Sequence, residues 1–381
     1  MKQTAAALLI LLLLPACALA FDLSAYEVPG SGKDYGSHVT PIAPGSALVN
    51  LPSMAVYLPD AAALVRDGEI IEEIAFPRDP DLYVDYSPYL KADGTMGACC
   101  RVQTEDFAFD PSGFALYDVQ GGALTNKRRI EGEPTSFAVE GGAFVGLRES
   151  EEQNAILLLY DENGQIRYTY QLPSLRARLQ GICMDGGDLL LMLELWEGIP
   201  QAQMLTLRID PAGQILWQFW QESKPLQSYI QVLRSGDGGA FLLASDAEDY
   251  KVKHLALVGT DGQIRWEKTF SVPKAIFSIH ETIPHPQTQS VALVGTVIAD
   301  SRKLYNAFIL EIGLDGNLLS LDVRDFSARG DYNFSCKLDQ SGVPYAVSDS
   351  LVFPKRKEGE KSVMVPLNEL PKASDPGIQI R

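Results

Sequence analysis

Cysteines are the residues with the most obvious chemical potential in this sequence. Cys99 and Cys100 are adjacent, and Cys183 and Cys336 follow further along the chain. Adjacent Cα atoms lie about 3.8 Å apart, whereas disulfides usually span about 4.4–6.8 Å between Cα atoms. Because residues 95–102 are predicted to form a strand, one thiol should enter the packing layer and the other should lie near the opposite face. We predict no bond between Cys183 and Cys336, which should be small buried hydrophobic residues.

Metal and phosphate chemistry have no recognisable motif here. The histidines His38, His254, His280 and His285 lack the spacing of a metal site. Asp261 and Asp315 belong to Asp-Gly turns, where an Asp side chain caps its own backbone, so they are predicted to be structural. The glycine-rich residues 141–146 precede a predicted strand and not a helix, which argues against a phosphate loop. The sequence therefore predicts no metal and no cofactor.

Acidic side chains could support glycoside hydrolysis, which uses two carboxyl groups at a defined separation. Candidate pairs are Glu151 with Glu152, Glu194 with Glu197, and Asp246 with Glu248. The sequence does not measure their separation and contains no G-x-S-x-G nucleophile motif. No catalytic residue is assigned.

The N-terminus has the layout of an export signal. Lys2 precedes an apolar run over residues 5–14, which is shorter than the roughly 20 residues of a membrane helix. Residues 18–20 read Ala-Leu-Ala, a cleavage site that would leave Phe21 as the first mature residue. In the alternative, residues 14–17 form a lipobox and Cys17 carries a lipid anchor. The predicted location is secreted or extracytoplasmic (periplasm or cell surface), with no membrane span in the mature chain.

Charge limits the class of partner. The chain has 32 Lys and Arg residues against 49 Asp and Glu residues, a net charge of −17. Nucleic-acid binding needs a concentrated positive surface, so no nucleic-acid partner is predicted. The short basic clusters at 127–129 and 355–357 are predicted to be solvated loop and strand-end residues.

A repeated segment organises most of the chain. Residues 158–170, 207–219 and 256–270 each run from an apolar stretch through a glycine to a second stretch with an aromatic residue. The glycines recur 43 to 54 residues apart, at Gly68, Gly121, Gly164, Gly213, Gly262 and Gly316. Each is predicted to take a positive φ between two antiparallel strands. Two further short strands precede each turn, giving four strands per unit.

Four strands in 40 to 55 residues is the content of a β-propeller blade. We predict an all-β propeller of four-stranded antiparallel blades. Seven blades are expected, with six or eight as alternatives, because residues 46–51 and 54–58 could each be the second strand of the first blade. The expected division is a signal peptide at 1–20, an N-terminal segment at 21–44, the propeller at 45–370 and a tail at 371–381. Residues 22–28 are expected to supply the missing outer strand of the last blade, since an open edge is a liability.

The repeat also resembles a known group. Asp210, Gly213 and Trp217 form one unit of a D-x-x-G-x-x-x-W pattern, Gly262 and Trp266 belong to another, and double glycines stand at 186–187 and 238–239. This pattern resembles the DGG and DxxGxxxW repeats of exported bacterial β-propellers, which are grouped near the quinoprotein-like propellers. The resemblance covers residues 45 to 350 and implies the fold. The glycine lies one residue early for a quinone-docking motif and no threonine precedes it, so quinone binding is not implied.

Ligands of propellers usually bind at one mouth of the channel, among the loops between second and third strands. These loops are expected at 103–112, 148–154, 194–203, 246–253, 298–305 and 352–361. Exposed loop aromatics are typical recognition anchors, and His280 is expected on an innermost strand. The candidate ligand-binding residues are Trp196, Glu197, Tyr250, Arg302, Tyr305, Phe107 and His280. The alternatives are aromatics folded back onto their own blade and a hydrogen-bonded wall histidine.

The sequence is consistent with two functions. The first is an exported binding module without catalysis, which takes a protein or glycan at the loop-bearing mouth. The second is an extracytoplasmic enzyme on a propeller scaffold: a polysaccharide hydrolase or lyase, or a quinone-dependent oxidoreductase. Convergence of His280 with carboxylates would favour the enzyme, and a mouth ringed by Trp196, Tyr250 and Tyr305 would favour the binder.

Overall fold

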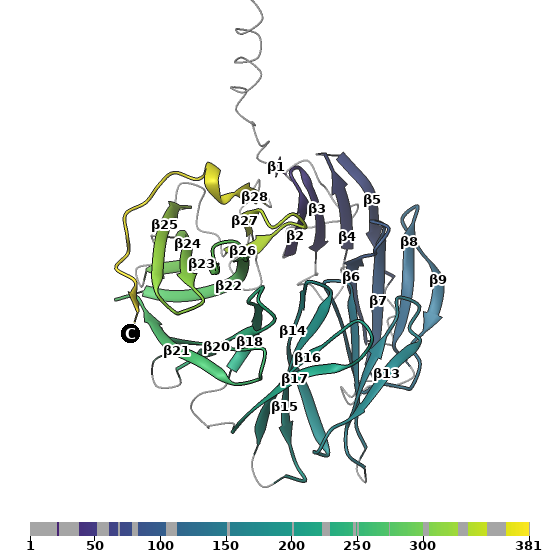
Figure 1. Cartoon of the computed structure of the whole chain (residues 1–381). Coiled ribbons are helices and arrows are strands. Elements are labelled where there is room, and N and C mark those ends of the chain that lie inside the picture. Colours follow the sequence, from purple (N-terminus) through teal and green to yellow (C-terminus); the bar gives the residue numbers. More distant parts are fainter. Residues whose placement is uncertain are drawn as a thin grey trace, which may run out of the picture.

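Seven antiparallel β-sheets surround a central axis in the computed structural model (Figure 1). The structure describes residues 21–22, 38–51, 61–67, 69–77, 83–103, 113–150, 153–199, 202–222, 229–246, 249, 251–273, 275–299, 305–326, 334–348 and 363–380. Six sheets have four strands and one has five. The predicted all-β propeller with seven blades is confirmed.

The blades are numbered here in the order of their innermost strands along the chain, and each runs from the axis outward. Blade 1 contains β2 (His38–Ala43), β3 (Ser46–Leu51), β4 (Ala61–Arg66) and β5 (Glu69–Ala75). Blade 2 contains β6 (Tyr83–Leu90), β7 (Met96–Gln103), β8 (Ala115–Gln120) and β9 (Ala123–Arg129). Blade 3 contains β10 (Ser136–Glu140), β11 (Ala143–Arg148), β12 (Ile156–Tyr160) and β13 (Ile166–Gln171).

The remaining blades follow the same order. Blade 4 contains β14 (Arg176–Asp185), β15 (Asp188–Trp196), β16 (Gln203–Ile209) and β17 (Ile215–Glu222). Blade 5 contains β18 (Tyr229–Arg234), β19 (Ala240–Ser245), β20 (Lys253–Val258), β21 (Ile264–Ser271) and an added β29 (Gln379–Ile380). Blade 6 contains β22 (Ala275–His285), β23 (Ser290–Ala299), β24 (Tyr305–Gly313) and β25 (Leu318–Asp325). Blade 7 contains β26 (Phe334–Leu338), β27 (Pro344–Ser348), β28 (Val363–Pro366) and β1 (Phe21–Asp22), and the short helix η4 (Leu367–Glu369) follows β28.

The repeated glycine has two separate reasons to be glycine. Its φ is positive, as predicted, at Gly164 (78°), Gly213 (79°), Gly262 (71°) and Gly316 (85°). The outer strand of the preceding blade also packs directly on it. A Cβ on Gly213 would lie 2.3 Å from Tyr168, and one on Gly262 would lie 2.6 Å from the backbone oxygen of Gln218. The turn of one blade is therefore the docking point of the blade before it.

Apolar side chains fill the space between the blades. The structure contains seven buried apolar clusters, and each joins two neighbouring blades. The cluster between blades 7 and 1, for example, combines Val39 and Val49 with Tyr345 and Met364. Side chains of a strand alternate between its two faces, so each blade buries both faces and contributes to two clusters.

The ring closes through blade 7. Phe21 pairs with Met364 and Asp22 with Val363, so the chain's N-terminal part supplies the outermost strand of the last blade. The expected closing segment is confirmed at Asp22, and residues 23–28 lie outside the described part of the chain. The first blade starts earlier than the expected residue 45, because residues 38–43 pair with β3 as the innermost strand. The second strand of blade 1 is β3, residues 46–51, which is one of the two segments expected for it. The other segment, 54–58, lies outside the described residues.

The C-terminal segment is a strap across three blades, visible in yellow at the edge of the ring in Figure 1. It leaves blade 7 after η4 and follows the outer strand of blade 6, where Ala373 N donates to Val323 O at 2.8 Å and Asp325 N to Pro371 O at 2.8 Å. It then joins blade 5, where Ile380 pairs with Phe270 and Gln379 with Ser271. Residues 371–380 of the expected tail therefore lie on the propeller, and Gln379–Ile380 form its additional strand.

The predicted burial of the cysteines is confirmed for Cys99, Cys100 and Cys336 but not for Cys183. Cys99 packs in the apolar cluster between blades 2 and 3. Cys100 interacts with Tyr86, which packs in the cluster between blades 1 and 2, so the two thiols face opposite sides of β7. Burial raises the pKa of Cys99 to about 12 and that of Cys100 to about 11. Cys336 is buried on β26 of blade 7, and Cys183 is half-buried on β14 of blade 4.

Candidate functional site

The propeller has two different faces. The loop face carries the connections between second and third strands and the crossings from blade to blade. The turn face carries the tight turns between first and second strands and between third and fourth strands. Of the described candidates, Trp196, Glu197 and Tyr305 lie at the loop face and His280 lies on an innermost strand. Phe107, Tyr250 and Arg302 lie outside the described residues, so the structure does not place them.

Two expected loop aromatics are strand residues instead. Trp196 is the last residue of β15 and pairs with Arg176 at the start of β14. Tyr305 is the first residue of β24 and pairs with Ile298. In both cases the strand continues further toward the loop face than the sequence predicted. The reason is that pairing with the neighbouring strand continues to this residue. The loop after β15 is therefore shorter than the expected 194–203.

Trp196 stands at an exposed corner of blade 4. Its relative exposure is 36%, which places it among the exposed large hydrophobic residues of the protein. The next residue, Glu197, has a positive φ of 62°, and Gly198 follows with 78°. Leu175 N donates to the carbonyl oxygen of Glu197 at 2.9 Å and holds this turn against the crossing from blade 3. The indole is thus presented by a fixed backbone.

Charged side chains brace the same corner. Arg176 Nε donates to Glu197 Oε2 at 3.3 Å, and its Nη1 lies 3.5 Å from Glu149 Oε2. Glu149 belongs to the loop after β11 in blade 3, and its Oε1 accepts a hydrogen bond from Ala177 N at 2.6 Å. Blades 3 and 4 are therefore linked beside Trp196. We call Glu149, Arg176, Trp196 and Glu197 the Trp196 corner.

The other acidic residues singled out from the sequence have structural partners. Glu194 Oε2 accepts a hydrogen bond from Gln180 at 2.5 Å. Asp246 Oδ2 lies 3.2 Å from His254 Nε2, and its Oδ1 accepts from Asp249 N at 3.0 Å. Glu151, Glu152 and Glu248 lie outside the described residues. Of the described members of these pairs, Glu194 and Asp246 are thus hydrogen-bonded within their own blades.

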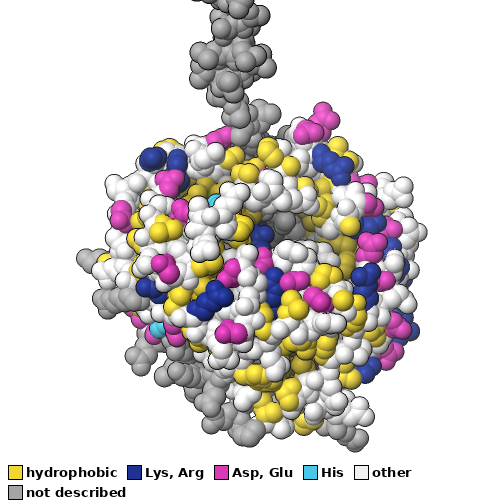
Figure 2. Space-filling view, viewed as in Figure 1, with side chains coloured by type: hydrophobic (Ala, Val, Ile, Leu, Met, Phe, Trp, Pro, Cys, Tyr) yellow, Lys and Arg dark blue, Asp and Glu magenta, His cyan; other side chains and the backbone are white. Residues whose placement is uncertain are grey.

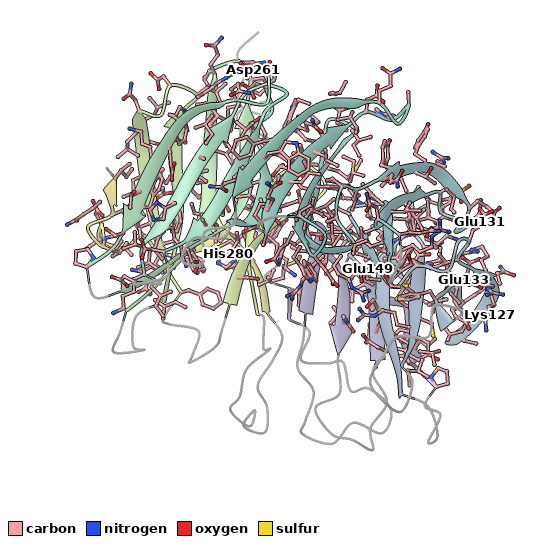
Figure 3. The ribbon with its side chains drawn as sticks, turned by 90° about the horizontal axis from the view of Figure 1, so that it is seen from below. Lys127, Glu131, Glu133, Glu149, Asp261 and His280 are labelled. Atoms are coloured by element: carbon pink, nitrogen blue, oxygen red, sulfur yellow. The ribbon has the colours of Figure 1, made fainter. Side chains whose placement is uncertain are left out.

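His280, labelled in Figure 3, lies on the innermost strand β22, as predicted. Its Nε2 is 3.0 Å from the hydroxyl oxygen of Thr296 on β23 of the same blade, and its carbonyl oxygen accepts from Gln231 Nε2 at 2.9 Å. These contacts fit the alternative of a hydrogen-bonded wall residue. Glu149, labelled in the same view, belongs to the Trp196 corner.

Other predicted structural roles are confirmed. Asp261 Oδ1 accepts from Gln263 N at 3.1 Å, and Asp315 Oδ1 accepts from Asn317 N at 3.0 Å, so both cap their own turns. In the basic cluster of blade 2, Arg129 is paired with Glu133 at 2.8 Å. Figure 3 shows Lys127, Glu131 and Glu133 together at one outer edge of the ring. The second basic cluster, at 355–357, lies outside the described residues.

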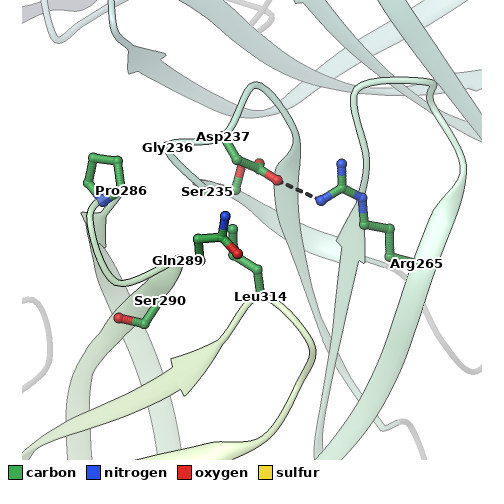
Figure 4. Close-up of a pocket in the computed structure, with 8 residues that line it drawn as sticks. All are labelled: Ser235, Gly236, Asp237, Arg265, Pro286, Gln289, Ser290 and Leu314. Atoms are coloured by element: carbon green, nitrogen blue, oxygen red, sulfur yellow. Dashed lines mark hydrogen bonds and ion pairs between the residues drawn. The ribbon is translucent and has the colours of Figure 1, made fainter.

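The turn face carries a pocket of about 290 Å³ between blades 5 and 6 (Figure 4). Asp237 and Arg265 form an ion pair of 2.7 Å across part of it. Burial alone would raise the pKa of Asp237, but hydrogen bonds from Ser235 and Gly239 N and the charge of Arg265 outweigh it and lower this pKa. The charged groups of the pocket are thus hydrogen-bonded to one another and stabilise the turn between β18 and β19.

A third group of residues was not recognised from the sequence. Glu140, Arg234, Glu281 and Lys337 stand on the innermost strands of blades 3, 5, 6 and 7, and their charges influence one another. Burial raises the pKa of Glu281 to about 7, and the neighbouring Arg234 opposes that rise. Figure 2 shows Lys, Arg, Asp and Glu side chains around the central hollow of the ring. The one sequence signal was the position of these residues on predicted innermost strands.

Among the described residues, no group of three or more His, Cys, Asp or Glu side chains is placed to hold a metal ion. No helix within those same residues combines the length and the apolar character needed to cross a membrane.

Comparison with known proteins gives only remote likeness. No protein-family model and no curated protein matches this sequence. The BBS1N chain, solved in complex with ARL6DN, is 11% identical at a TM-score of 0.45, over 91% of this chain and 97% of that chain. A prolyl endopeptidase is 12% identical (TM-score 0.46, 98% of this chain and 55% of that chain). Prolyl oligopeptidase B from Galerina marginata is 10% identical (TM-score 0.47, 90% and 52%).

This chain spans about half the length of those two peptidases. At such low identity and similarity of shape, the comparisons say nothing about activity or ligand. The propeller assignment rests on the order and pairing of the strands.

Proposed function

We propose that this protein is an exported, non-catalytic β-propeller that binds a protein or glycan at its loop face. The observation that carries the proposal is the Trp196 corner. An exposed indole and two carboxylates are held there by backbone and ion-pair contacts between two blades. Large aromatic side chains beside polar partners supply much of the binding energy at recognition surfaces.

Rigidity supports binding at this corner. A side chain that is already ordered loses little conformational freedom on complex formation, so more of the contact energy appears as affinity. The turn that follows Trp196 is fixed by the Leu175–Glu197 backbone bond, and a Cβ on Gly198 would lie 2.9 Å from Leu175. The backbone under the indole is thus closely packed. An aromatic ring held in this way suits the flat face of a sugar or an apolar side chain of a protein.

Export belongs to this proposal and rests on the N-terminal sequence. Residues 1–20 have the layout of a signal peptide, with release after Ala20 or lipid attachment at Cys17 as the two routes. Either route places the propeller outside the cytoplasm, where proteins and glycans of a cell surface are available. The net charge of −17 accords with a partner other than nucleic acid.

An enzyme is the second candidate, and two glutamates on innermost strands, Glu140 and Glu281, are the observation that favours it. Glu140 on β10 and Glu281 on β22 both belong to innermost strands; burial raises the pKa of Glu281 to about 7, and the negative charge of Glu140 adds to that rise. A protonated carboxyl beside an ionised one is the arrangement of a glycosidase pair. The innermost strands hold this pair at the axis, remote from the exposed indole.

The test uses residues 21–381 in three forms: the wild type, Trp196→Ala and Trp220→Ala. Trp220 is a matched control, because it is 38% exposed and lies on the outer strand of the same blade. Each form is incubated with surface extract of the producing cell and cross-linked, and the attachment sites are mapped by mass spectrometry. Proteinase treatment of the retained material separates a protein from a glycan.

We expect one retained species, cross-linked to the loops of blades 3 and 4 and recovered at its original size. Trp196→Ala should weaken its retention roughly tenfold or more, while Trp220→Ala leaves it unchanged. Equal retention by both variants would reject the Trp196 corner. Shortened glycan or peptide in the wild-type sample would instead establish an enzyme.

A further inference from the structure

One turn of the propeller departs from the pattern of the others. In every blade a tight turn on the turn face joins the first strand to the second. Outside blade 6 this turn contains a glycine with a positive φ, and these glycines are Gly45, Gly94, Gly142, Gly187, Gly238 and Gly342. Blade 6 has Gln289 instead, with a φ of 50°. Blade 6 therefore holds a side chain in a backbone conformation for which the other blades use glycine.

The backbone of Gln289 is kept in this conformation by its neighbours. A side chain is unfavourable at a positive φ, because its Cβ crowds a backbone carbonyl oxygen. Residues held in this way are concentrated at binding sites. The carbonyl oxygen of Gln289 accepts from Leu314 N at 2.9 Å, and Leu314 O accepts from Trp266 Nε1 of blade 5 at 2.9 Å. The turn is thus fixed to both blades.

The side chain of Gln289 lines the pocket between blades 5 and 6 (Figure 4). Asp237 and Arg265 line it from blade 5, and Pro286 and Leu314 add apolar surface from blade 6. Its volume of about 290 Å³ is close to the lower end of the range of about 300–1,000 Å³ for ligand pockets. The pocket would therefore hold a small molecule or one terminal unit of a larger one.

The polar groups of the pocket have hydrogen-bonding capacity left over. A guanidinium has several N–H donors, and within the described part of the chain Arg265 uses only Nη1, which donates to Asp237 Oδ2 at 2.7 Å. Asp237 Oδ1 accepts from Ser235 Oγ and Gly239 N, so Oδ2 keeps a further acceptor position. The side-chain amide of Gln289 makes no hydrogen bond to another described residue. Donors and acceptors are thus available side by side.

The charge of the pocket favours a neutral ligand. Asp237 and Arg265 compensate one another, and no other charged residue lines the pocket among those that the structure describes. An anion would be repelled by Asp237, and a cation would be repelled by Arg265. An uncharged ligand with several hydroxyl groups can donate to the carboxylate and accept from the guanidinium at the same time.

We propose that this pocket binds a neutral pyranose sugar through two adjacent hydroxyl groups. The oxygens of adjacent hydroxyls are about as far apart as the partners of a hydrogen bond, so they can bridge Asp237 and Arg265, which contact each other at 2.7 Å. One hydroxyl donates to Asp237 Oδ2, and the other accepts from Arg265. The amide of Gln289 binds a further hydroxyl, and the C–H face of the ring packs on Pro286 and Leu314.

Saturation-transfer NMR and calorimetric titration of residues 21–381 test the proposal. The probes are the methyl glycosides of glucose, galactose, mannose and N-acetylglucosamine. The same glycosides methylated at every hydroxyl are the controls, because they cannot donate a hydrogen bond. We expect saturable binding of at least one glycoside and none of its methylated form. A disaccharide that ends in the bound sugar then identifies the source, since equal binding indicates the end of a glycan and lost binding a free sugar.

Gln289→Gly is the most informative variant, because it removes the amide and also relieves the backbone at this φ of 50°. It should keep a melting temperature close to that of the wild type and bind the sugar roughly tenfold more weakly or worse. Gln287→Ala is the matched control, since Gln287 belongs to the same turn but does not line the pocket. It should leave the affinity unchanged.

A second variant removes the bridging donor. Arg265→Gln takes away the guanidinium and leaves Asp237 bonded to Ser235 and Gly239 N, so the turn should stay folded while the affinity falls roughly tenfold or more. The melting temperature without ligand shows whether each variant is folded. Trp196→Ala should not change the affinity, because the Trp196 corner lies on the loop face of another blade.

Some results would overturn the proposal. These are no binding of any glycoside, equal binding of the methylated forms, and undiminished binding by both Gln289→Gly and Arg265→Gln. Sugar binding that is lost in Trp196→Ala and kept in Gln289→Gly would assign the sugar to the loop face and reject this pocket. The two sites can therefore fail independently of one another.

Discussion

Trp217 on the outer strand of blade 4 donates a hydrogen bond from its indole Nε1 to the carbonyl oxygen of Gly238 in blade 5, over 2.8 Å. Trp266 repeats the relationship one blade further on, where its Nε1 donates to the carbonyl oxygen of Leu314 in blade 6 at 2.9 Å. Tyr170 of blade 3 reaches Gly213 O of blade 4 in a similar way, at 2.5 Å. The conspicuous aromatic of the repeat is therefore a connection between blades and not a ligand group.

Trp217→Phe tests this connection. The change removes the indole N–H and leaves the carbonyl oxygen of Gly238 without its partner, so the free energy of unfolding should fall by about 1 to 2 kcal/mol. Urea unfolding followed by circular dichroism gives that value. Trp220→Phe is the control, since Trp220 is 38% exposed. Equal stability of the two variants would argue against a docking role for Trp217.

The repeated glycine gives a second prediction. Gly213→Ala should destabilise the protein by about 2 kcal/mol or more, because alanine is strained at φ 79° and its Cβ would overlap Tyr168. Gly142→Ala is matched in backbone, with φ 84°, but its Cβ would meet no atom within 4 Å. The difference between the two unfolding free energies isolates blade packing from backbone strain. If the two variants lose the same stability, packing against Tyr168 contributes nothing.

Removal of the C-terminal strap gives a third prediction. A chain that ends at Leu370 loses β29 and the apolar contacts of Ala373, Ile378 and Ile380 with the cluster between blades 5 and 6. The expected loss is about 2 to 4 kcal/mol, and the edge of β21 becomes open to association. Urea unfolding and light scattering measure the two effects. The control lacks Arg381 alone, and a truncated chain that is equally stable and monodisperse would show that the strap is dispensable.

Glu281 should make stability depend on pH in a recognisable direction. Its pKa is raised to about 7 in the folded protein, so the folded state binds more protons than the unfolded state between about pH 4.5 and pH 7. Its contribution to stability is present below the unfolded pKa and is lost as pH rises through 7. Unfolding free energies at several pH values should fall more steeply for the wild type than for Glu281→Gln. Parallel curves would mean that Glu281 titrates normally.

The buried thiols of blade 2 give a fifth prediction. Cys99 and Cys100 are 3% and 5% exposed, and burial raises the pKa of both. The thiolate is the reactive form, so iodoacetamide should label neither residue in the folded protein at neutral pH and both in urea. Mass spectrometry of tryptic peptides reads the labels. A pair that remains unlabelled in urea, and becomes reactive only after reduction, would reveal a disulfide between them.

Local sequence was enough to predict the blades. Glycine at 164, 213, 262 and 316 is required by a positive φ, and alternating apolar residues identify strands that bury one face or both. These signals lie within a few residues of one another, so they can be read without knowledge of distant contacts. The closing strand at Asp22 was also accessible, because a ring of incomplete blades must be completed by another part of the chain.

The sequence by itself therefore determined the propeller, its turns and its closure, and the tertiary structure decided the sites. Trp196 was expected in a loop, but its pairing with Arg176 makes it the last residue of β15, at the loop face. His280 was singled out because it was expected on an innermost strand, and the structure places its Nε2 3.0 Å from the hydroxyl oxygen of Thr296, at a shift in the register of β22. Glu140 and Lys337 are distant in the chain and belong to blades that are not neighbours. Only the closing of the ring lets the charges of these two residues influence one another.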